Sequence, residues 1–150
     1  MTHVIKIAKT EDISGILSLR YQSTENKLRT EVTYEMIQRC LTTHCRAWVA
    51  ISDDAVIGFS LANKKLKMIW GLFVLPSYQG LGIGKALLQE ATLWLQHNAK
   101  DMFLYPCKKI WLNTEIDGRA EKFYQHLGWE KGKAVSETEV RYWYTFQKQR

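Results

Sequence analysis

The chain has 150 residues, 46% of them apolar and 12% aromatic, so it is long enough for one packed domain and too apolar to be disordered. Its formal net charge of +6 comes from basic residues scattered along the sequence, which argues against a nucleic-acid partner and would suit a polyanionic ligand. No apolar run is long enough to cross a bilayer, and residues 1–6 show no signal-peptide pattern. We therefore expect a single cytoplasmic domain over residues 1–150 with no membrane partner.

The three cysteines, Cys40, Cys45 and Cys107, are odd in number and show no C-x-x-C spacing. This pattern argues against a disulfide framework and against a structural zinc site. Cys40, His44 and Cys45 could form part of a metal site, but no fourth ligand is evident and Cys40 fits the apolar face of a helix. We expect no bound metal.

The first half of the chain predicts a strand, two helices and three further strands. Apolar residues alternate with polar ones in residues 3–9, as in a half-buried strand. Thr10 is the expected N-cap of a helix that ends near Tyr21, and a second helix begins at Thr33. The next strands are expected at 46–51, 56–62 and 68–75, with a hairpin turn at 52–55 and the last strand covered on both faces.

A glycine-rich loop follows the strand that ends near Pro76. Gly80, Gly82 and Gly84 occupy alternate positions, and an amphipathic helix then runs to about residues 97–98. Glycines let bare backbone approach a ligand, and the first turn of a helix favours an anion, so this loop predicts a diphosphate site. The spacing fits neither the G-x-G-x-x-G dinucleotide motif nor a Walker A loop, because Ala86 follows Lys85 where a Ser or Thr is required.

The second half predicts a strand at 109–113, a helix capped by Asp117 and stopped by Gly128, and strands at 130–135 and 138–146. A helix between two strands of one sheet implies a right-handed parallel crossover. The chain therefore predicts a mixed α/β sheet with antiparallel strands early and a β-α-β unit in the middle. The order is β-α-α-β-β-β-α-β-α-β-β.

Two motifs and this order resemble the GCN5-related N-acetyltransferases (GNAT family) over essentially the whole chain. Residues 79–84 are similar to the family's Gln/Arg-x-x-Gly-x-Gly/Ala signature. Residues 117–129 resemble its N-x-x-A-x-x-F-Y-x-x-x-G-F segment, with Asp117 in place of the usual Asn and Trp129 in place of the usual Phe. The stretch Ser23 to Leu28 is similar to uncharacterised bacterial members of the family. The resemblance implies the acyl-CoA N-acyltransferase fold.

The resemblance implies acetyl-coenzyme A as co-substrate and places it residue by residue. The strand residues Leu72, Phe73 and Val74 would pair with the pantetheine arm, which requires this strand to splay from its parallel neighbour. Asn113, at the end of that neighbour, would bond pantetheine with its amide or is only a strand-end residue. The pyrophosphate would be surrounded by Gln79, Gly80, Leu81, Gly82, Ile83, Gly84 and Lys85.

Tyr124 matches the tyrosine that faces the cofactor sulfur in many relatives, where a phenol can protonate the leaving thiolate. The competing interpretation is a core tyrosine beside Phe123, which we assign to packing. The chain departs from the family where many members carry a glutamate, because Trp70 and Gly71 stand there and the strand has no acid. Deprotonation of the amine would then depend on water or on a residue elsewhere, with the candidates Glu25, His44, Glu115 and Glu139.

The acceptor site is the least determined part of the prediction. Residues 22–29 lie where relatives place substrate-contacting loops, and an ordinary solvated loop fits them equally well. Trp70 is either an aromatic wall of the acceptor site or a core residue. The candidate acceptor-site residues are Tyr21, Glu25, Asn26, Arg29 and Trp70.

The predicted function is transfer of an acetyl group from acetyl-CoA to a primary amine of a small molecule or peptide. The absent strand glutamate leaves a non-catalytic module that binds acyl-CoA as an alternative. A nucleic-acid binder would rest on net charge alone. The aromatic strand at 140–146 would suit a homodimer or an intramolecular core.

Overall fold

The computed structural model describes residues 2–22, 31–101 and 107–146. Its helices and strands follow the predicted order, with the single-turn 3-10 helices η1 and η3 in addition. The elements are β1 (Val4–Ile7), η1 (Thr10–Asp12), α1 (Ile13–Gln22), α2 (Tyr34–Thr43), β2 (Cys45–Ser52), β3 (Ala55–Asn63), β4 (Met68–Val74), η3 (Pro76–Tyr78), α3 (Ile83–Asn98), β5 (Lys109–Glu115), α4 (Arg119–His126), β6 (Glu130–Ala134) and β7 (Glu139–Thr145). The mixed α/β fold predicted from the sequence is confirmed.

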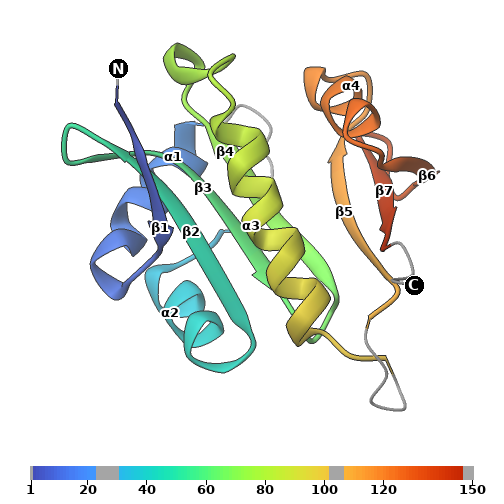
Figure 1. Cartoon of the computed structure of the whole chain (residues 1–150), viewed down its shortest axis with the longest axis horizontal. Coiled ribbons are helices and arrows are strands. Elements are labelled where there is room, and N and C mark those ends of the chain that lie inside the picture. Colours follow the sequence, from blue (N-terminus) through green and yellow to red (C-terminus); the bar gives the residue numbers. More distant parts are fainter. Residues whose placement is uncertain (1, 23–30, 102–106, 147–150) are drawn as a thin grey trace.

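The strands form one sheet of seven, in the order β1-β2-β3-β4-β5-β7-β6. Neighbouring strands pair antiparallel except β4 and β5, which are parallel and connected through α3. Figure 1 shows β5, β6 and β7 with α4 as a group beside the larger group formed by the other elements. The boundary between the two groups is the β4–β5 pair.

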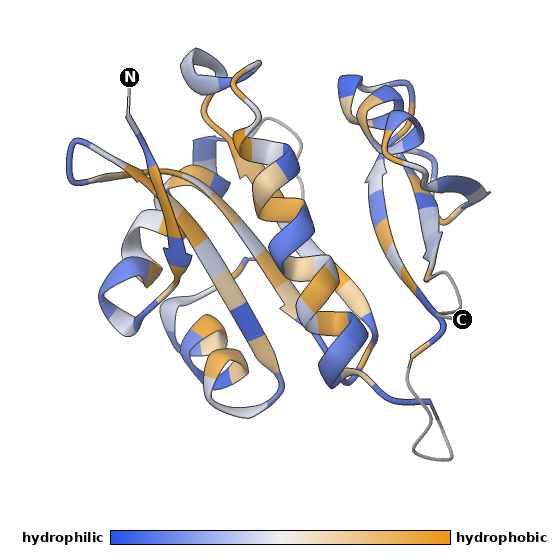
Figure 2. Cartoon of the chain, viewed as in Figure 1, coloured by the Kyte–Doolittle hydropathy of each residue, from blue (hydrophilic) through white to orange (hydrophobic). Residues whose placement is uncertain are grey.

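Helices cover the two faces of the sheet unequally. α3 packs on one face of β2, β3 and β4, while α1 and α2 pack on the other. Figure 2 shows apolar residues along β2, β3 and β4 and in a stripe on α3, as helix burial on a sheet requires. α4 contacts β5 and β6, and its Tyr124 belongs to the same core as α3.

Two predicted helix caps are wrong, and in both cases a carboxylate further along the chain does the capping. Thr10 lies inside η1, and the Asp12 carboxylate accepts a hydrogen bond of 2.8 Å from the Lys9 N–H. Asp117 precedes the cap residue Gly118 and has a φ of 61°, a region that Asp tolerates better than most residues. Its backbone N–H donates to the carboxylate of Glu121. Thr33 caps α2 as predicted, through its hydroxyl and the Met36 N–H.

The sequence argued against a disulfide framework, but the structure contains a disulfide. Cys40, in the last turn of α2, and Cys45, the first residue of β2, are joined by a disulfide. The chain reverses between them and brings their Cα atoms to 5.1 Å, within the range that a disulfide spans. The odd count leaves Cys107 as the free cysteine, and it is buried.

Strand β4 is covered on both faces only in part. Trp70 is 38% exposed, and the pairing with β3 shifts register beside it.

Of the helices in the described ranges, none combines the length and the apolar character that a membrane crossing needs.

Candidate active site

The parallel strands β4 and β5 separate towards their carboxyl ends. Their only ladder pair within the described residues is Met68 with Trp111, next to a hydrogen bond of 3.2 Å from the Trp111 N–H to the Lys67 carbonyl. Beyond this point β4 continues to pair with β3 alone, and Figure 1 shows β5 running away from it. The edge of β4 that faces β5 is therefore open to an extended ligand, as the sequence analysis required.

The glycine-rich loop lies at the open end of β4. Gly80 and Gly82 have φ values of 82° and 83°, which side-chain-bearing residues rarely adopt, and no protein atom lies within 4 Å of where their Cβ atoms would be. α3 begins directly after Gly82, and the first N–H groups of a helix have no acceptor within it. The loop thus offers bare backbone and a positive helix end to an anion.

The predicted loop residues differ in what they expose. Ile83 is 1% exposed, so only its backbone faces the loop, whereas Leu81 and Lys85 are exposed at the surface. Gln79 donates from its side-chain amide to the Val74 carbonyl at 3.1 Å and so ties the loop to the end of β4. This contact fixes the loop against the strand that would hold the pantetheine arm.

Tyr124 lies on α4 within an aromatic cluster of the core shared with α3. It is 6% exposed, and its ring centroid lies 5.9 Å from that of Trp129 and 6.0 Å from that of Tyr142. Phe123 points to the first turn of α3, where a Cβ on Gly84 would lie 3.6 Å from its Cζ. Tyr124 therefore connects α4 to β7, and Phe123 connects α4 to the first turn of α3.

The buried carboxylate of Glu121 fixes Tyr142, one of the residues of this cluster. The Tyr142 hydroxyl donates to Glu121 at 2.6 Å, the Asp117 N–H donates to the other oxygen, and Lys131 Nζ lies 3.0 Å away. These bonds lower the pKa of Glu121 to about 2, and the hydrogen bond from Tyr142 is the largest cause. Burial, followed by the Glu121 hydrogen bond, raises the pKa of Tyr142 to about 12. At neutral pH the pair is a carboxylate and a neutral phenol, and it fastens α4 to β7.

Glu121→Gln is expected to lower the free energy of unfolding at pH 7 by about 1–3 kcal/mol, because buried donors then lose a charged acceptor. The folded-state pKa of about 2 lies below the ordinary 4.5, so this contribution is complete above pH 4.5 and fades as the pH falls towards 2. Urea unfolding across this pH range measures it. A difference from the wild type that stays constant from pH 5 to about 2 contradicts the assignment, and Glu90→Gln, an exposed site on α3, is the control.

Arg141 is a residue at this site that the sequence analysis missed. Its guanidinium stacks over Trp111, with its Cζ 3.9 Å from the ring centroid, and its Nε donates to Asn113 Oδ1 at 3.1 Å. Trp111 is itself fixed, because its indole N–H donates to the Leu66 carbonyl at 3.0 Å. The alternating pattern of β7, with Val140 and Tyr142 buried, places Arg141 on the opposite face, which was the available signal.

The two aromatic residues predicted for the acceptor site lie at the surface. Trp70 packs under the Arg20 guanidinium, whose Cζ lies 5.1 Å from the ring centroid, so it is a surface residue and not a core tryptophan. Tyr21 is 88% exposed at the end of α1. The remaining predicted acceptor residues, Glu25, Asn26 and Arg29, lie outside the described residues.

The structure separates the alternative bases. His44 lies where β2 begins, next to the β3–β4 turn, because Cys45 pairs with Asn63. That is the end of the sheet opposite the glycine loop. Glu115 and Glu139 pair with each other at the carboxyl end of β5, which is the loop end. Glu25 lies outside the described residues.

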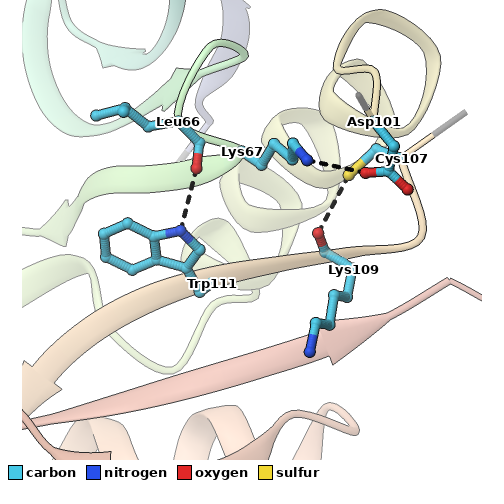
Figure 3. Close-up of polar contacts among 6 residues, drawn as sticks. All are labelled: Leu66, Lys67, Asp101, Cys107, Lys109 and Trp111. Carbon is cyan, nitrogen blue, oxygen red and sulfur yellow. Dashed lines mark hydrogen bonds and ion pairs between the residues drawn. The ribbon is translucent and has the colours of Figure 1, made fainter. Parts of the chain in front are cut away.

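A set of polar contacts lies beside the first residues of β4 and β5 (Figure 3). Lys67 forms an ion pair of 2.9 Å with Asp101, and the Cys107 thiol donates to the Lys109 carbonyl at 3.1 Å. Burial, with Asp101 as the next cause, raises the pKa of the Cys107 thiol, so it stays protonated and is a poor nucleophile. The ion pair joins the β3–β4 turn to the segment after α3, while the Cys107 bond lies within the segment that leads into β5.

A surface hollow of about 460 Å³ lies elsewhere, between β1, β2 and the outer side of α3. None of the glycine-loop residues lines it. It is therefore separate from the opening between β4 and β5.

The sequence profile of the acetyltransferase (GNAT) domain matches residues 43–131, which include β4, the glycine loop and α4. The chain belongs to the GNAT family. A search of curated proteins found no match. The GNAT domain therefore spans the loop, the diverging strands and Tyr124.

Solved structures share this fold over nearly the whole chain. PaiA N-acetyltransferase from Thermoplasma acidophilum, in complex with coenzyme A, has a TM-score of 0.77 at 16% identity, covering 97% of this chain and 100% of that one. The ribosomal-protein-S18-alanine N-acetyltransferase from Escherichia coli gives 0.72 at 13% identity, with coverage of 99% and 97%. The NatC complex bound to Gag peptide and CoA gives 0.73 at 18%, with coverage of 98% and 100%. At these identities the similarity establishes the GNAT fold.

Proposed function

We propose that this GNAT protein transfers an acetyl group from acetyl-CoA to the primary amine of a small molecule or peptide. The observation that carries the proposal is the opening between β4 and β5 with an exposed glycine loop at its end. An extended arm and a diphosphate need these two features side by side. The coenzyme A named in the PaiA and NatC structures supports the choice of donor.

The cofactor residues are proposed from the family pattern and the geometry together. Leu72, Phe73 and Val74 would pair with the pantetheine arm along the open edge of β4. The backbone from Gly80 to Lys85 would surround the pyrophosphate, with Gln79 holding the loop in place through Val74. Asn113 already accepts a bond from Arg141, so only its amide N–H₂ is left to donate to a ligand.

In this proposal the co-substrate supplies a thioester carbonyl that an amine can attack, and the chain supplies the rest. A backbone N–H at the end of β4, such as that of Val74, would polarise the carbonyl. The Tyr124 phenol would give its proton to the leaving sulfur. Among the described base candidates, Glu115 and Glu139 are favoured over His44 because they lie at the loop end of the sheet.

Two measurements test the proposal. Isothermal titration should give saturable binding of acetyl-CoA, and no binding at high micromolar concentration refutes the donor site. A panel of amines, comprising polyamines, amino acids and peptide N-termini, is then screened for release of free CoA thiol. Release with any of them identifies the acceptor class.

The alternative, a non-catalytic module that binds acyl-CoA, is favoured by one observation. β4 carries Trp70 and Gly71 where many GNAT enzymes have a glutamate, so the strand provides no base. Binding of acetyl-CoA without thiol release from the whole panel would support this alternative over the enzyme.

Arg141→Leu is expected to raise KM for an acceptor that carries a carboxylate by about tenfold or more, which is a loss of about 1.4 kcal/mol. Its stacked and hydrogen-bonded guanidinium is held in place with its two terminal nitrogens directed to no acceptor in the described part of the chain. The dissociation constant of acetyl-CoA should stay unchanged. Pairs of amino acids and their decarboxylated amines measure the effect, and an equal loss for both members contradicts it.

A further inference from the structure

Cys40, His44 and Cys45 form a cluster of potential metal ligands at the end of the sheet far from the glycine loop. Cys40 lies in the last turn of α2, His44 is its C-cap, and Cys45 opens β2. One side-chain ligand atom from each of the three lies within 4.8 Å of the others. The cluster is separate from the opening between β4 and β5, and the proposed acetyl transfer makes no use of it.

The donor set matches a thiophilic divalent cation. Two thiolates and one imidazole are the ligands that zinc prefers, at about 2.3 Å for sulfur and about 2.0 Å for nitrogen. Ligand atoms around such a tetrahedral ion lie about 3.3–3.8 Å apart. When the disulfide is reduced, the two sulfurs have to separate to non-bonded contact, about 3.5–4 Å, which is nearly the same spacing.

A hydrogen bond at His44 Nδ1 favours the tautomer whose Nε2 lone pair can bind a metal ion. The Thr43 hydroxyl donates to the Arg39 carbonyl at 2.9 Å and lies 2.8 Å from His44 Nδ1. Because the hydroxyl proton is used, its oxygen accepts from a protonated Nδ1, which leaves the lone pair on Nε2. Metal-binding histidines are oriented in the same way by a bond from their second nitrogen.

The surroundings provide access and suitable charge. A hollow of about 320 Å³ is lined by Thr43, His44 and Cys45, so solvent reaches the cluster and a water could complete four-fold coordination. The negative end of the α2 dipole lies beside the cluster and attracts a cation. Arg46 and Lys64 line the same hollow and would repel a free cation, but two thiolates balance the charge of a divalent ion.

We propose that the reduced chain binds one zinc-class cation through Cys40, His44 and Cys45, and that the disulfide is the metal-free form of the same site. The conversion needs a two-electron reductant. A phosphine, for example, takes oxygen from water to become its oxide while the S–S bond gains two electrons and two protons to give two thiols. Binding of the cation then releases a proton from each thiol.

The test uses the whole chain, reduced with a phosphine, desalted without oxygen, and titrated with Co²⁺ as an optical probe before displacement by Zn²⁺. Saturation at one equivalent with thiolate-to-cobalt absorption is expected. Cys40→Ser, Cys45→Ser and His44→Ala should each weaken binding at least about tenfold. Cys107→Ser, which alters the free cysteine, should bind like the wild type.

Two further measurements on the wild type do not depend on the folding of any variant. Zn²⁺ should protect Cys40 and Cys45 from alkylation, as mapped by mass spectrometry, and leave Cys107 unaffected. The air-oxidised chain should show one free thiol after denaturation and bind no cobalt. No saturable binding by the reduced chain, or protection that omits Cys40 and Cys45, overturns the metal site; three free thiols after oxidation overturn its disulfide form.

Discussion

Gly82→Ala is expected to raise the dissociation constant of acetyl-CoA at least about tenfold, which corresponds to about 1.4 kcal/mol. The residue has a φ of 83°, where a side chain costs about 1–2 kcal/mol, so the loop has to strain or move. No protein atom lies within 4 Å of the new Cβ, so it points into open space beside the loop, on which the proposed diphosphate would lie. Isothermal titration of the variant with acetyl-CoA measures the loss.

Gly84→Ala is the matched control, two residues further along in the first turn of α3. There a Cβ would lie 3.6 Å from Phe123 and 3.7 Å from Val74, which is ordinary contact, and the φ value is not positive. Alanine also favours a helix interior over glycine by about 0.5–1 kcal/mol. Acetyl-CoA affinity should therefore be little changed, with thermal stability equal or higher. Equal losses for both variants would show that the loop does not hold the ligand by its backbone.

The elements and their order were predictable because each has a strong local signal. The β-branched residues of β1, the apolar run of β4 and the spacing of Leu87, Ala91 and Leu95 in α3 each indicate the local structure that forms. The divergence of β4 from β5 followed from the family pattern. Its depth could not be predicted, because it depends on one ladder pair, Met68 with Trp111, formed by residues far apart in sequence.

What the sequence analysis missed depends on tertiary contacts. Asp117 is of a residue type that commonly caps helices. Here, however, its backbone N–H donates to Glu121, because Tyr142 on a distant strand fixes that carboxylate. The disulfide depends on the chain reversal after α2, which places Cys45 opposite Asn63 and beside the helix end. The cysteine count carried no information about that reversal.

The candidate site also has one part that local sequence predicts and another that depends on tertiary contacts. Local pattern identifies the glycine loop and Tyr124, since both lie within short motifs. Arg141 acquires its orientation from Trp111 and Asn113 on the neighbouring strand, and no motif contains the three. The proposed donor side of the site can thus be predicted from sequence motifs, whereas the proposed acceptor side depends on which strands become neighbours.

Tyr124→Phe is expected to lower kcat by about 10²- to 10⁴-fold, the usual contribution of a general acid, while the acetyl-CoA dissociation constant changes little. The ring stays, so its contacts with Phe123, Trp129 and Tyr142 are kept and only the hydroxyl is removed. Turnover of whichever amine the panel identifies, measured by thiol release from pH 6 to 10, reports the effect.

Tyr144→Phe separates this role from packing, because it makes the same chemical change within the same aromatic cluster. The Tyr144 ring lies 5.4 Å from Trp129 and 5.5 Å from Phe146, and the residue is on β7 and not on the helix beside the loop. Its kcat should match the wild type if Tyr124 acts through its proton. If both variants lose turnover together with thermal stability, the hydroxyls act through the cluster. An unchanged kcat in Tyr124→Phe would assign proton delivery to solvent, because the phenol would then contribute nothing to the departure of the thiolate.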